Sequence, residues 1–285
     1  MEEENLVKFT LFQWNTLNRK LSNKKAFPLV KDKYLQWFYR HPLLKQIIEE
    51  NNSDIICLEE VGNNFEKDFK EKIFEKSIIK YDLVFELRKS KSMGIVIGVN
   101  KELFSIEKHE NIILEDGEGN KTGQNMVSAL INNKKANNNF MIIALHLISK
   151  EENENIRLNQ VQHLMKYIED NHLGKYPIFI LGDFNAEPNF SCIQKFLENK
   201  KLGAKSLFNL NELDYTHYIF KQKICRRIFD YMFFVPKDKN NIDNELKVLN
   251  AERGKPAIDE NIGLPNEVFP SDHLFLKAKL ELFFL

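Results

Sequence analysis

The sequence predicts an α+β fold, a four-layer sandwich of two packed mixed β-sheets flanked by helices. Short apolar segments typical of strands recur along the whole chain, and helical segments occur singly among them without strict alternation. This mixture favours parallel and antiparallel pairing together, with the sheets packed face to face and the helices outside. No change in composition marks a linker and no internal period is present, so residues 1–285 are expected to form one domain.

The first half of the chain is expected to consist mainly of strands. Apolar residues dominate 6–14, and residues 54–58 read as a short buried strand. Pro42 is expected in the first turn of an amphipathic helix, the position that proline favours, and residues 65–73 repeat apolar side chains at helical spacing. Further extended segments are expected at 81–87, 94–99, 126–131 and 140–147.

The second half is expected to begin with a long helix. Residues 153–170 carry their apolar side chains on one helical face. The continuous apolar run at 177–181 is typical of a strand that is buried on both faces. A helix near 191–199 and strands at 228–235, 246–251 and 274–282 complete the expected order.

The charge balance excludes a global attraction to polyanions. The chain has 41 Lys and Arg against 41 Asp and Glu, so any affinity for phosphate must come from local clusters such as 19–25, 88–91 and 221–227. Three widely spaced cysteines argue against a disulfide framework or a structural zinc site. No apolar run has the length of a signal peptide or a membrane span. We therefore expect a soluble cytoplasmic protein, working as a monomer.

The most informative segment follows the buried strand at 177–181. Gly182 removes a side chain where something must approach the backbone closely. If the backbone stays extended, Asp183 and Asn185 project to the same side and present an acceptor beside a donor. The alternative is a strand end followed by an Asx-type turn.

Further polar residues occur at or near expected strand ends, namely Asn15, Glu60, His146, Asp230, Asp272 and His273. Each has a structural alternative, such as a turn cap or a hydrogen-bonded core histidine. Asp230 is the hardest to explain in that way, because an ionised carboxylate between Phe229 and Phe233 needs a partner. Together, carboxylates and amides suit Mg²⁺ or Mn²⁺ rather than zinc, and an oriented histidine suits metal-assisted phosphate ester hydrolysis.

Six ordered motifs carry a resemblance to a known family. They are Gln13-Trp14-Asn15, the segment from Asp54 to Val61, Leu145-His146-Leu147, the segment from Gly182 to Pro188, Phe229-Asp230-Tyr231, and the segment from Pro270 to Leu274. Over essentially its whole length the chain resembles the endonuclease/exonuclease/phosphatase superfamily, in particular its branch of nocturnin and carbon-catabolite-repression-type deadenylases. The resemblance implies a sandwich of two mixed sheets, in agreement with the pattern of elements.

The resemblance also implies metal ligands. Glu60 matches the principal ligand, Asn15 lies near the metal, and Asp272 matches a residue close to it. Two departures concern this region: Glu59 stands where the family commonly has Gln, and Met93 replaces an Asp that is common in deadenylases. The second departure weakens the case for poly(A) as the substrate, and neither removes a catalytic group.

The remaining catalytic roles follow from the same resemblance. Asp183 would orient or deprotonate the attacking water, Asn185 would hold the scissile phosphate, and His146 would contact a phosphate oxygen, although Leu145 replaces the usual Thr or Ser before it. His273, oriented by Asp230, would stabilise the transition state or protonate the leaving oxygen.

The expected substrate is an RNA 3′ end or a nucleotide, including a phosphorylated dinucleotide that loses its 2′-phosphate. Candidate cationic contacts to it are Arg157, Lys91, Arg226 and Arg227. The last two lie just before the strand at 228–235, on an expected hairpin that leads into the active site. A phosphoinositide or sphingolipid head group is the alternative substrate, although the sequence has no apolar loop for approaching a membrane. An inactive binding module on the same scaffold is the other alternative, and the presence of every catalytic group argues against it.

Overall fold

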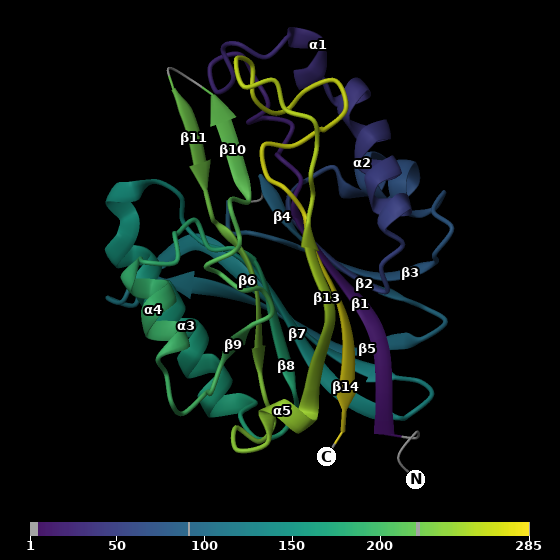
Figure 1. Ribbon diagram of the computed structural model, residues 1–285, viewed down its shortest axis with the longest axis vertical. Coiled ribbons are helices and arrows are strands. Elements are labelled where there is room, and N and C mark those ends of the chain that lie inside the picture. The colour runs from purple at the N-terminus through teal and green to yellow at the C-terminus, as the bar shows by residue number, and fades with distance from the viewer. Residues whose placement is uncertain (1–4, 91, 221–222, 285) are drawn as a thin grey trace.

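Two six-stranded mixed sheets pack face to face in the computed structural model, which describes residues 5–90, 92–220 and 223–284 (Figure 1). The first sheet has the order β13 (Leu246–Arg253), β14 (Leu276–Phe283), β1 (Leu6–Asn15), β2 (Ile55–Gly62), β4 (Met93–Asn100) and β3 (Tyr81–Leu87). The second has the order β5 (Phe104–Glu115), β6 (Lys121–Asn133), β7 (Asn138–His146), β8 (Ile178–Asp183), β12 (Asp230–Val235) and β9 (Lys205–Ser206).

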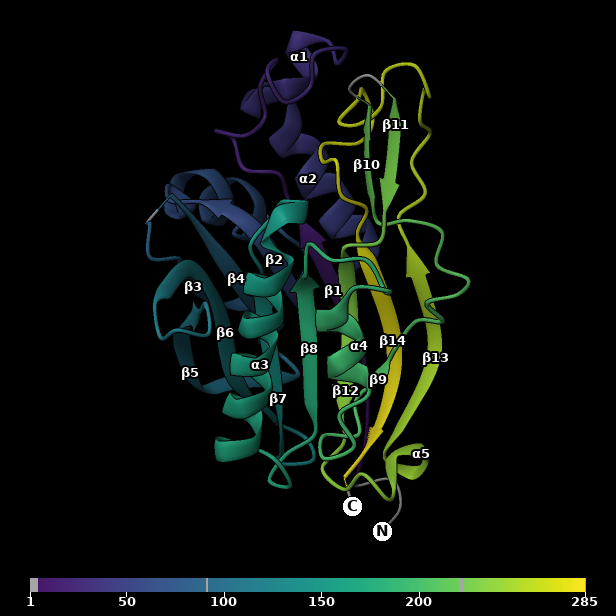
Figure 2. The same cartoon turned by 90° about the vertical axis from the view of Figure 1, so that its left-hand side faces the viewer.

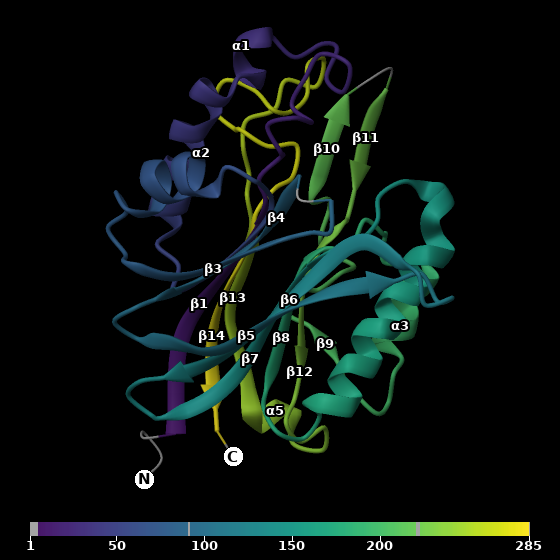
Figure 3. The same ribbon diagram turned by 180° about the vertical axis from the view of Figure 1, so that it is seen from behind.

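Helices cover the outer face of each sheet. Helix α2 (Trp37–Asn51) and the π-helix Glu66–Phe74 pack on the first sheet. Helices α3 (Glu154–Asn171) and α4 (Ser191–Leu197) pack on the second, as Figures 2 and 3 show. Short helical segments are α1 (Asp32–Leu35), α5 (Ile242–Glu245) and the 3₁₀ turn Glu151–Asn153. The predicted α+β four-layer sandwich is confirmed.

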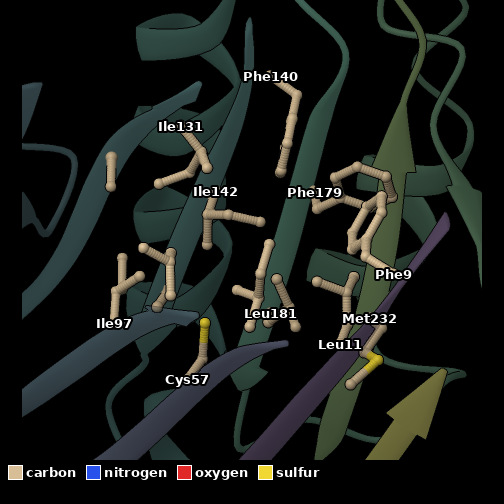
Figure 4. Packing of buried hydrophobic residues seen from close by; sticks show 14 of the residues in the cluster. Phe9, Leu11, Cys57, Ile97, Ile131, Phe140, Ile142, Phe179, Leu181 and Met232 are labelled. Atoms are coloured by element: carbon tan, nitrogen blue, oxygen red, sulfur yellow. The ribbon is translucent and has the colours of Figure 1, made fainter. Parts of the chain in front are cut away.

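The inner faces of the two sheets form the central core (Figure 4). Phe9 of β1 stacks on Phe140 of β7 with ring centroids 5.3 Å apart and meets Phe179 of β8 edge-on at 5.6 Å. Alternate residues of β1 point the other way, so Phe12 and Trp14 pack under the helices of the first sheet. Strands buried on both faces explain why the sequence reads as continuous apolar runs.

Most expected elements are present within a few residues, and one expectation about a helix start is wrong. Helix α2 begins at Trp37, and Pro42 lies inside it. Trp37 packs on Phe69 with ring centroids 5.3 Å apart, and the fully buried Arg40 binds three backbone carbonyls. These tertiary contacts stabilise helical residues before Pro42, so the helix begins earlier than the first-turn preference of proline predicts.

Strand β5 is the longest element that was not expected from the sequence. It has charged side chains exposed at its centre, which hid its apolar period. Strands β10 (His217–Phe220) and β11 (Ile224–Arg227) form the hairpin that was expected just before the strand at 228–235. It lies beside the loop that precedes β14, at the end of the sandwich opposite the termini (Figures 1 and 2). The functional site lies at this end.

Among the residues described, no helix is both long enough and apolar enough to cross a membrane.

Candidate functional site

The register of three neighbouring strands brings three predicted residues side by side. Parallel pairing of β7 with β8 sets His146 opposite Asp183, and antiparallel pairing of β8 with β12 sets Asp183 opposite Asp230. Gly182 permits this register, because a Cβ at its φ of 148° would lie 2.0 Å from the carbonyl oxygen of Leu145. The close backbone approach expected at this glycine is therefore confirmed.

The chain turns immediately after Asp183. Asn185 has a left-handed φ of 49°, and its backbone N–H donates to Asp183 Oδ1 at 2.8 Å, which is an Asx-type turn. The extended backbone considered for these two residues is therefore wrong. The turn nevertheless leaves Asn185 in the wall of the cavity described below.

Asp183 is also the point where the two sheets join at the site. Asn15, at the end of β1 in the first sheet, donates from Nδ2 to Asp183 Oδ2 in the second sheet at 3.0 Å. Its own Oδ1 accepts the backbone N–H of Leu17 at 3.1 Å, which holds the amide in this orientation. Asn15 is therefore fixed against the carboxylate expected to handle the attacking water.

Glu60 reaches the same place from a bulge in β2. The register of β2 against β4 shifts between Leu58 and Val61, and Glu60 has a left-handed φ of 57°. Its Oε2 accepts the backbone N–H of Asn18 at 2.7 Å, and its Oε1 lies 4.0 Å from His146 Nε2. The same His146 nitrogen lies 3.6 Å from Asp183 Oδ2, so one imidazole separates the two carboxylates.

The carboxylates of Glu60 and Asp183 are of the donor type that suits the hard divalent cation expected from the sequence, whereas Asn15 presents its Nδ2 to Asp183 and its Oδ1 to the backbone of Leu17. Carboxylate and amide oxygens are the ligands that Mg²⁺ and Mn²⁺ accept, and Mg²⁺ usually binds through one or two carboxylates while keeping several waters. Glu60 has the more accessible carboxylate of the pair, since Asp183 is almost fully buried.

His273 and Asp230 form the expected hydrogen bond. His273 Nδ1 and Asp230 Oδ2 are 2.9 Å apart, and both residues are buried. Burial by itself would lower the pKa of His273, but the charges of Asp230 and Asp183 outweigh it and raise this pKa well above its ordinary value. The buried carboxylate that the sequence left without a partner is thus paired with an imidazole.

Two further side chains hold Asp230 in place. Gln13 Nε2 donates to Asp230 Oδ1 at 3.0 Å and to Glu59 Oε2 at 2.8 Å, and Thr216 Oγ1 accepts the backbone N–H of Asp230 at 3.0 Å. Burial, and then the charge of Asp230, raise the pKa of Glu59 well above its ordinary value. Gln13 interrupts an apolar strand as Asp230 does, so the sequence carried the same signal for it.

Asp272 lies beside the site but contacts a residue that sequence analysis did not single out. Its Oδ2 is 3.4 Å from Nε2 of His217, at the start of β10. Burial would raise the pKa of Asp272, but the imidazoles of His217 and His273 outweigh it and hold this pKa below its ordinary value. Nothing in the local sequence marks His217, because a loop and a hairpin bring it here.

Arg40 is a second residue that the sequence did not reveal. Its guanidinium donates to the carbonyls of Pro270, Thr16 and Leu17 at 2.6 to 2.7 Å, so it ties the end of β1 to the loop before His273. Burial lowers its pKa to about 10, against the opposing charges of Asp272 and Glu60.

A cavity of about 870 Å³ opens beside His273 and Asn185. Its wall includes Phe190, Phe229 and Ile219, together with the cations Lys150, Lys223 and Arg227. Arg227 also pairs with Glu187 at 3.0 Å. The hairpin expected to carry cations toward the active site is therefore present.

The other expected cationic contacts behave differently. Arg226 alternates to the opposite face of β11, where it pairs with Glu260 at 2.6 Å and lies over Tyr215, so its expected place in the cavity is wrong. Arg157 is in the cavity wall but fully buried, and its Nη1 donates to the carbonyls of Ile148 and Lys150, so it supports the loop instead of facing solvent. Lys91 lies outside the described residues.

The profile of the endonuclease/exonuclease/phosphatase family matches residues 12–282 of this chain. Among curated relatives, the Ccr4 subunit of the CCR4-Not complex from Kluyveromyces lactis, a 3′-5′-exoribonuclease, is 23% identical over 96% of this chain and 41% of its own length. Human nocturnin is 26% identical over 93% of this chain and 63% of its own length. The chain thus spans less than two thirds of these relatives.

Solved structures share the fold along the whole chain. The human nocturnin catalytic domain with bound sulfate superposes with a TM-score of 0.74 at 22% identity, covering 96% of this chain and 95% of that one. The 2′,3′-cyclic phosphatase ANGEL2, in complex with adenosine-2′,3′-vanadate, gives a TM-score of 0.79 at 19% identity, covering 98% and 96%.

Proposed function

The chain belongs to the endonuclease/exonuclease/phosphatase family, and we propose that it is a metal-dependent hydrolase acting on phosphate esters of RNA 3′ ends or nucleotides. The observation that carries this proposal is the juxtaposition of Glu60 and Asp183 around His146, next to the buried His273–Asp230 pair. An oxygen-rich cation site and an oriented imidazole are groups that suit metal-assisted phosphate ester hydrolysis.

Mg²⁺ or Mn²⁺ is the proposed cofactor, with Glu60 as its main ligand and Asn15 close by. When bound, the cation would supply positive charge to the phosphate oxygens. The bulge at Glu60 and the hydrogen bond from the Asn18 backbone fix the carboxylate before any cation arrives. Asp272 was expected near this metal, and its contact with His217 favours a different partner for it.

Asp183 is the proposed group that orients and deprotonates the attacking water. Each oxygen of its carboxylate already accepts one hydrogen bond: Oδ2 from Asn15 Nδ2, and Oδ1 from the backbone N–H of Asn185. Its carboxylate is therefore held in one orientation, which a base needs in order to aim a water at phosphorus. Asn185 and His146 are the proposed contacts to phosphate oxygens.

His273 is the proposed donor to the oxygen that leaves or to the charge that develops. Its Nδ1 is engaged by Asp230, which leaves Nε2 directed elsewhere, at 3.7 Å from Asp183 Oδ2. The raised pKa of His273 favours the protonated ring, which can donate. Asp230, Gln13 and Thr216 position this ring through the contacts already described.

A nucleotide or RNA substrate suits the cavity better than a lipid head group. Aromatic rings of Phe190 and Phe229 can contact a base, and Lys223 and Arg227 can contact further phosphates. The names of the relatives agree with this substrate class: an exoribonuclease, and a phosphatase with an adenosine-based ligand. We further propose that the chain forms one domain, since both sheets share one core. Monomeric state and a cytoplasmic location are part of the same proposal.

The test is an activity panel with added Mg²⁺ or Mn²⁺. The arms are poly(A) RNA, other single-stranded RNA, single- and double-stranded DNA, NADPH, a 2′,3′-cyclic nucleotide and inositol phosphates. We expect metal-dependent turnover of an RNA or nucleotide arm, and its loss in Asp183→Asn. Turnover of the inositol phosphates alone would move the proposal to lipid head groups, and no turnover of any arm by folded protein would favour the inactive binding module.

A further inference from the structure

We propose that His217, Asp272 and His273 form a second cation site, which binds zinc-like divalent ions in preference to Mg²⁺. Within the described residues, one ligand atom from each of these three side chains lies within 4.8 Å of the other two. The set contains two imidazoles and one carboxylate. It shares no residue with the oxygen-rich site of Glu60 and Asn15.

The distance between two of the ligand atoms is compatible with a shared metal. His217 Nε2 and Asp272 Oδ2 are 3.4 Å apart. A protein hydrogen bond between nitrogen and oxygen normally spans about 2.7–3.2 Å. Two ligands bound to one tetrahedral Zn²⁺ at about 2.0–2.2 Å lie roughly 3.4 Å from each other.

Backbone pairing holds the three side chains together before any ion binds. The Tyr218 N–H donates to the carbonyl of Asp272 at 2.8 Å, and the Leu274 N–H donates to the carbonyl of Thr216 at 2.6 Å. These bonds flank an isolated antiparallel bridge between His217 and His273. Little rearrangement is therefore needed to close the site around an ion.

One of the two histidines has the partner found in known zinc sites, whereas His217 Nδ1 is buried and has no hydrogen-bond partner among the residues described. A zinc-binding histidine usually donates its other ring N–H to a carboxylate, which fixes the ring and its tautomer. His273 has this partner, because its Nδ1 lies 2.9 Å from Asp230 Oδ2. The ring of His217 is held by Phe229, with centroids 5.3 Å apart and planes 27° from parallel.

Asp272 also has an unused ligand atom. Its Oδ1 is buried and accepts no hydrogen bond from any part of the chain that the structure describes, although the residue is only 8% exposed. A cation would satisfy this oxygen or its neighbour. His217 and His273 both line the cavity, so a fourth ligand could be water or a substrate oxygen, as in zinc sites with an open position.

The donor set decides which ion is preferred. Imidazole nitrogen suits Zn²⁺ and Co²⁺, whereas Mg²⁺ favours oxygen ligands. Zn²⁺ bound to His273 Nε2 would displace to solvent the proton that this atom is proposed to donate during hydrolysis, so we expect it to inhibit Mg²⁺-supported turnover. This inhibition rests on the proposed function, whereas the binding itself does not.

The experiment measures binding to the metal-free full-length protein in excess Mg²⁺. Zn²⁺ is titrated by calorimetry, and Co²⁺ is used as a spectroscopic probe of imidazole coordination. We expect one equivalent of Zn²⁺ to bind the wild type. His217→Asn should weaken binding at least about tenfold, because loss of even an outer-shell partner of a metal ligand typically costs about 10- to 100-fold in affinity. Two controls should bind as the wild type does: Cys225→Ser, which removes the thiol in the cavity wall, and His109→Asn on β5.

Equal Zn²⁺ affinity in His217→Asn and the wild type would overturn the proposal, as would loss of binding in Cys225→Ser. If His217→Asn does not fold by circular dichroism, Asp272→Asn is titrated in the same way and decides by the same criterion. In parallel, Zn²⁺ should inhibit hydrolysis at concentrations that match its binding. A protein that binds Zn²⁺ through His217 but hydrolyses no arm of the panel would contradict only the proposed function.

Discussion

Breaking the hydrogen bond between His273 and Asp230 should cost most of the catalytic rate. Asp230→Asn keeps the shape of the side chain but removes the charge that holds the imidazole 2.9 Å away. Positioned acid–base groups contribute about 10²- to 10⁴-fold to rate, which corresponds to about 3–5 kcal/mol of transition-state stabilisation. We expect kcat on the best substrate of the panel to decrease by a factor in this range in Asp230→Asn and in His273→Ala.

The pH dependence should change along with the rate. Asp230 is the largest contribution that raises the pKa of His273. A reaction that needs the protonated ring is retained below this pKa and lost as the pH rises through it. In Asp230→Asn the raised pKa falls, so the alkaline loss of kcat should begin at a lower pH than in the wild type.

A double-mutant cycle decides whether the two residues act as one unit. If they do, Asp230→Asn combined with His273→Ala should be only slightly slower than the slower single variant. Thermal unfolding of each variant checks that the fold persists. Losses that multiply, giving a double variant slower by the product of both single effects, would refute the pairing.

Three further predictions test other parts of the site. Glu60→Gln should abolish Mg²⁺-supported turnover and leave the unfolding midpoint nearly unchanged, since the side chain lies at the site and not in the core; full activity, or a collapsed fold, would contradict its role. Arg227→Ala should raise KM more than it lowers kcat, and it should weaken the salt dependence of KM. Arg226→Ala, on the other face of β11, is the matched control. Equal effects of the two changes would reject a contact between Arg227 and the substrate in the cavity. Gly182→Ala should destabilise the protein by about 1–3 kcal/mol or prevent folding, because the new Cβ overlaps the carbonyl of Leu145. An unchanged midpoint of urea unfolding would contradict this, since it would mean that β7 and β8 can move apart without loss of stability.

Local features of the sequence were sufficient for the layers and for several site residues. Apolar runs identified the buried strands, because a strand covered on both faces needs apolar side chains at every position. The same runs made Asp230 conspicuous, since a carboxylate in such a strand must have a partner. Motif resemblance then supplied roles for Glu60, Asp183 and His273, which no spacing in the chain could have related to one another.

Local patterns along the chain therefore define the kind of each element and the polar residues at its ends. The register that places His146, Asp183 and Asp230 side by side, and the position of the β10–β11 hairpin that brings His217 to Asp272, emerge only in the folded protein. The tertiary structure also decides that Arg227 faces the cavity and Arg226 faces away. The physical reason is that periodicity is a local property of the chain, whereas register and facing depend on contacts between segments far apart in sequence.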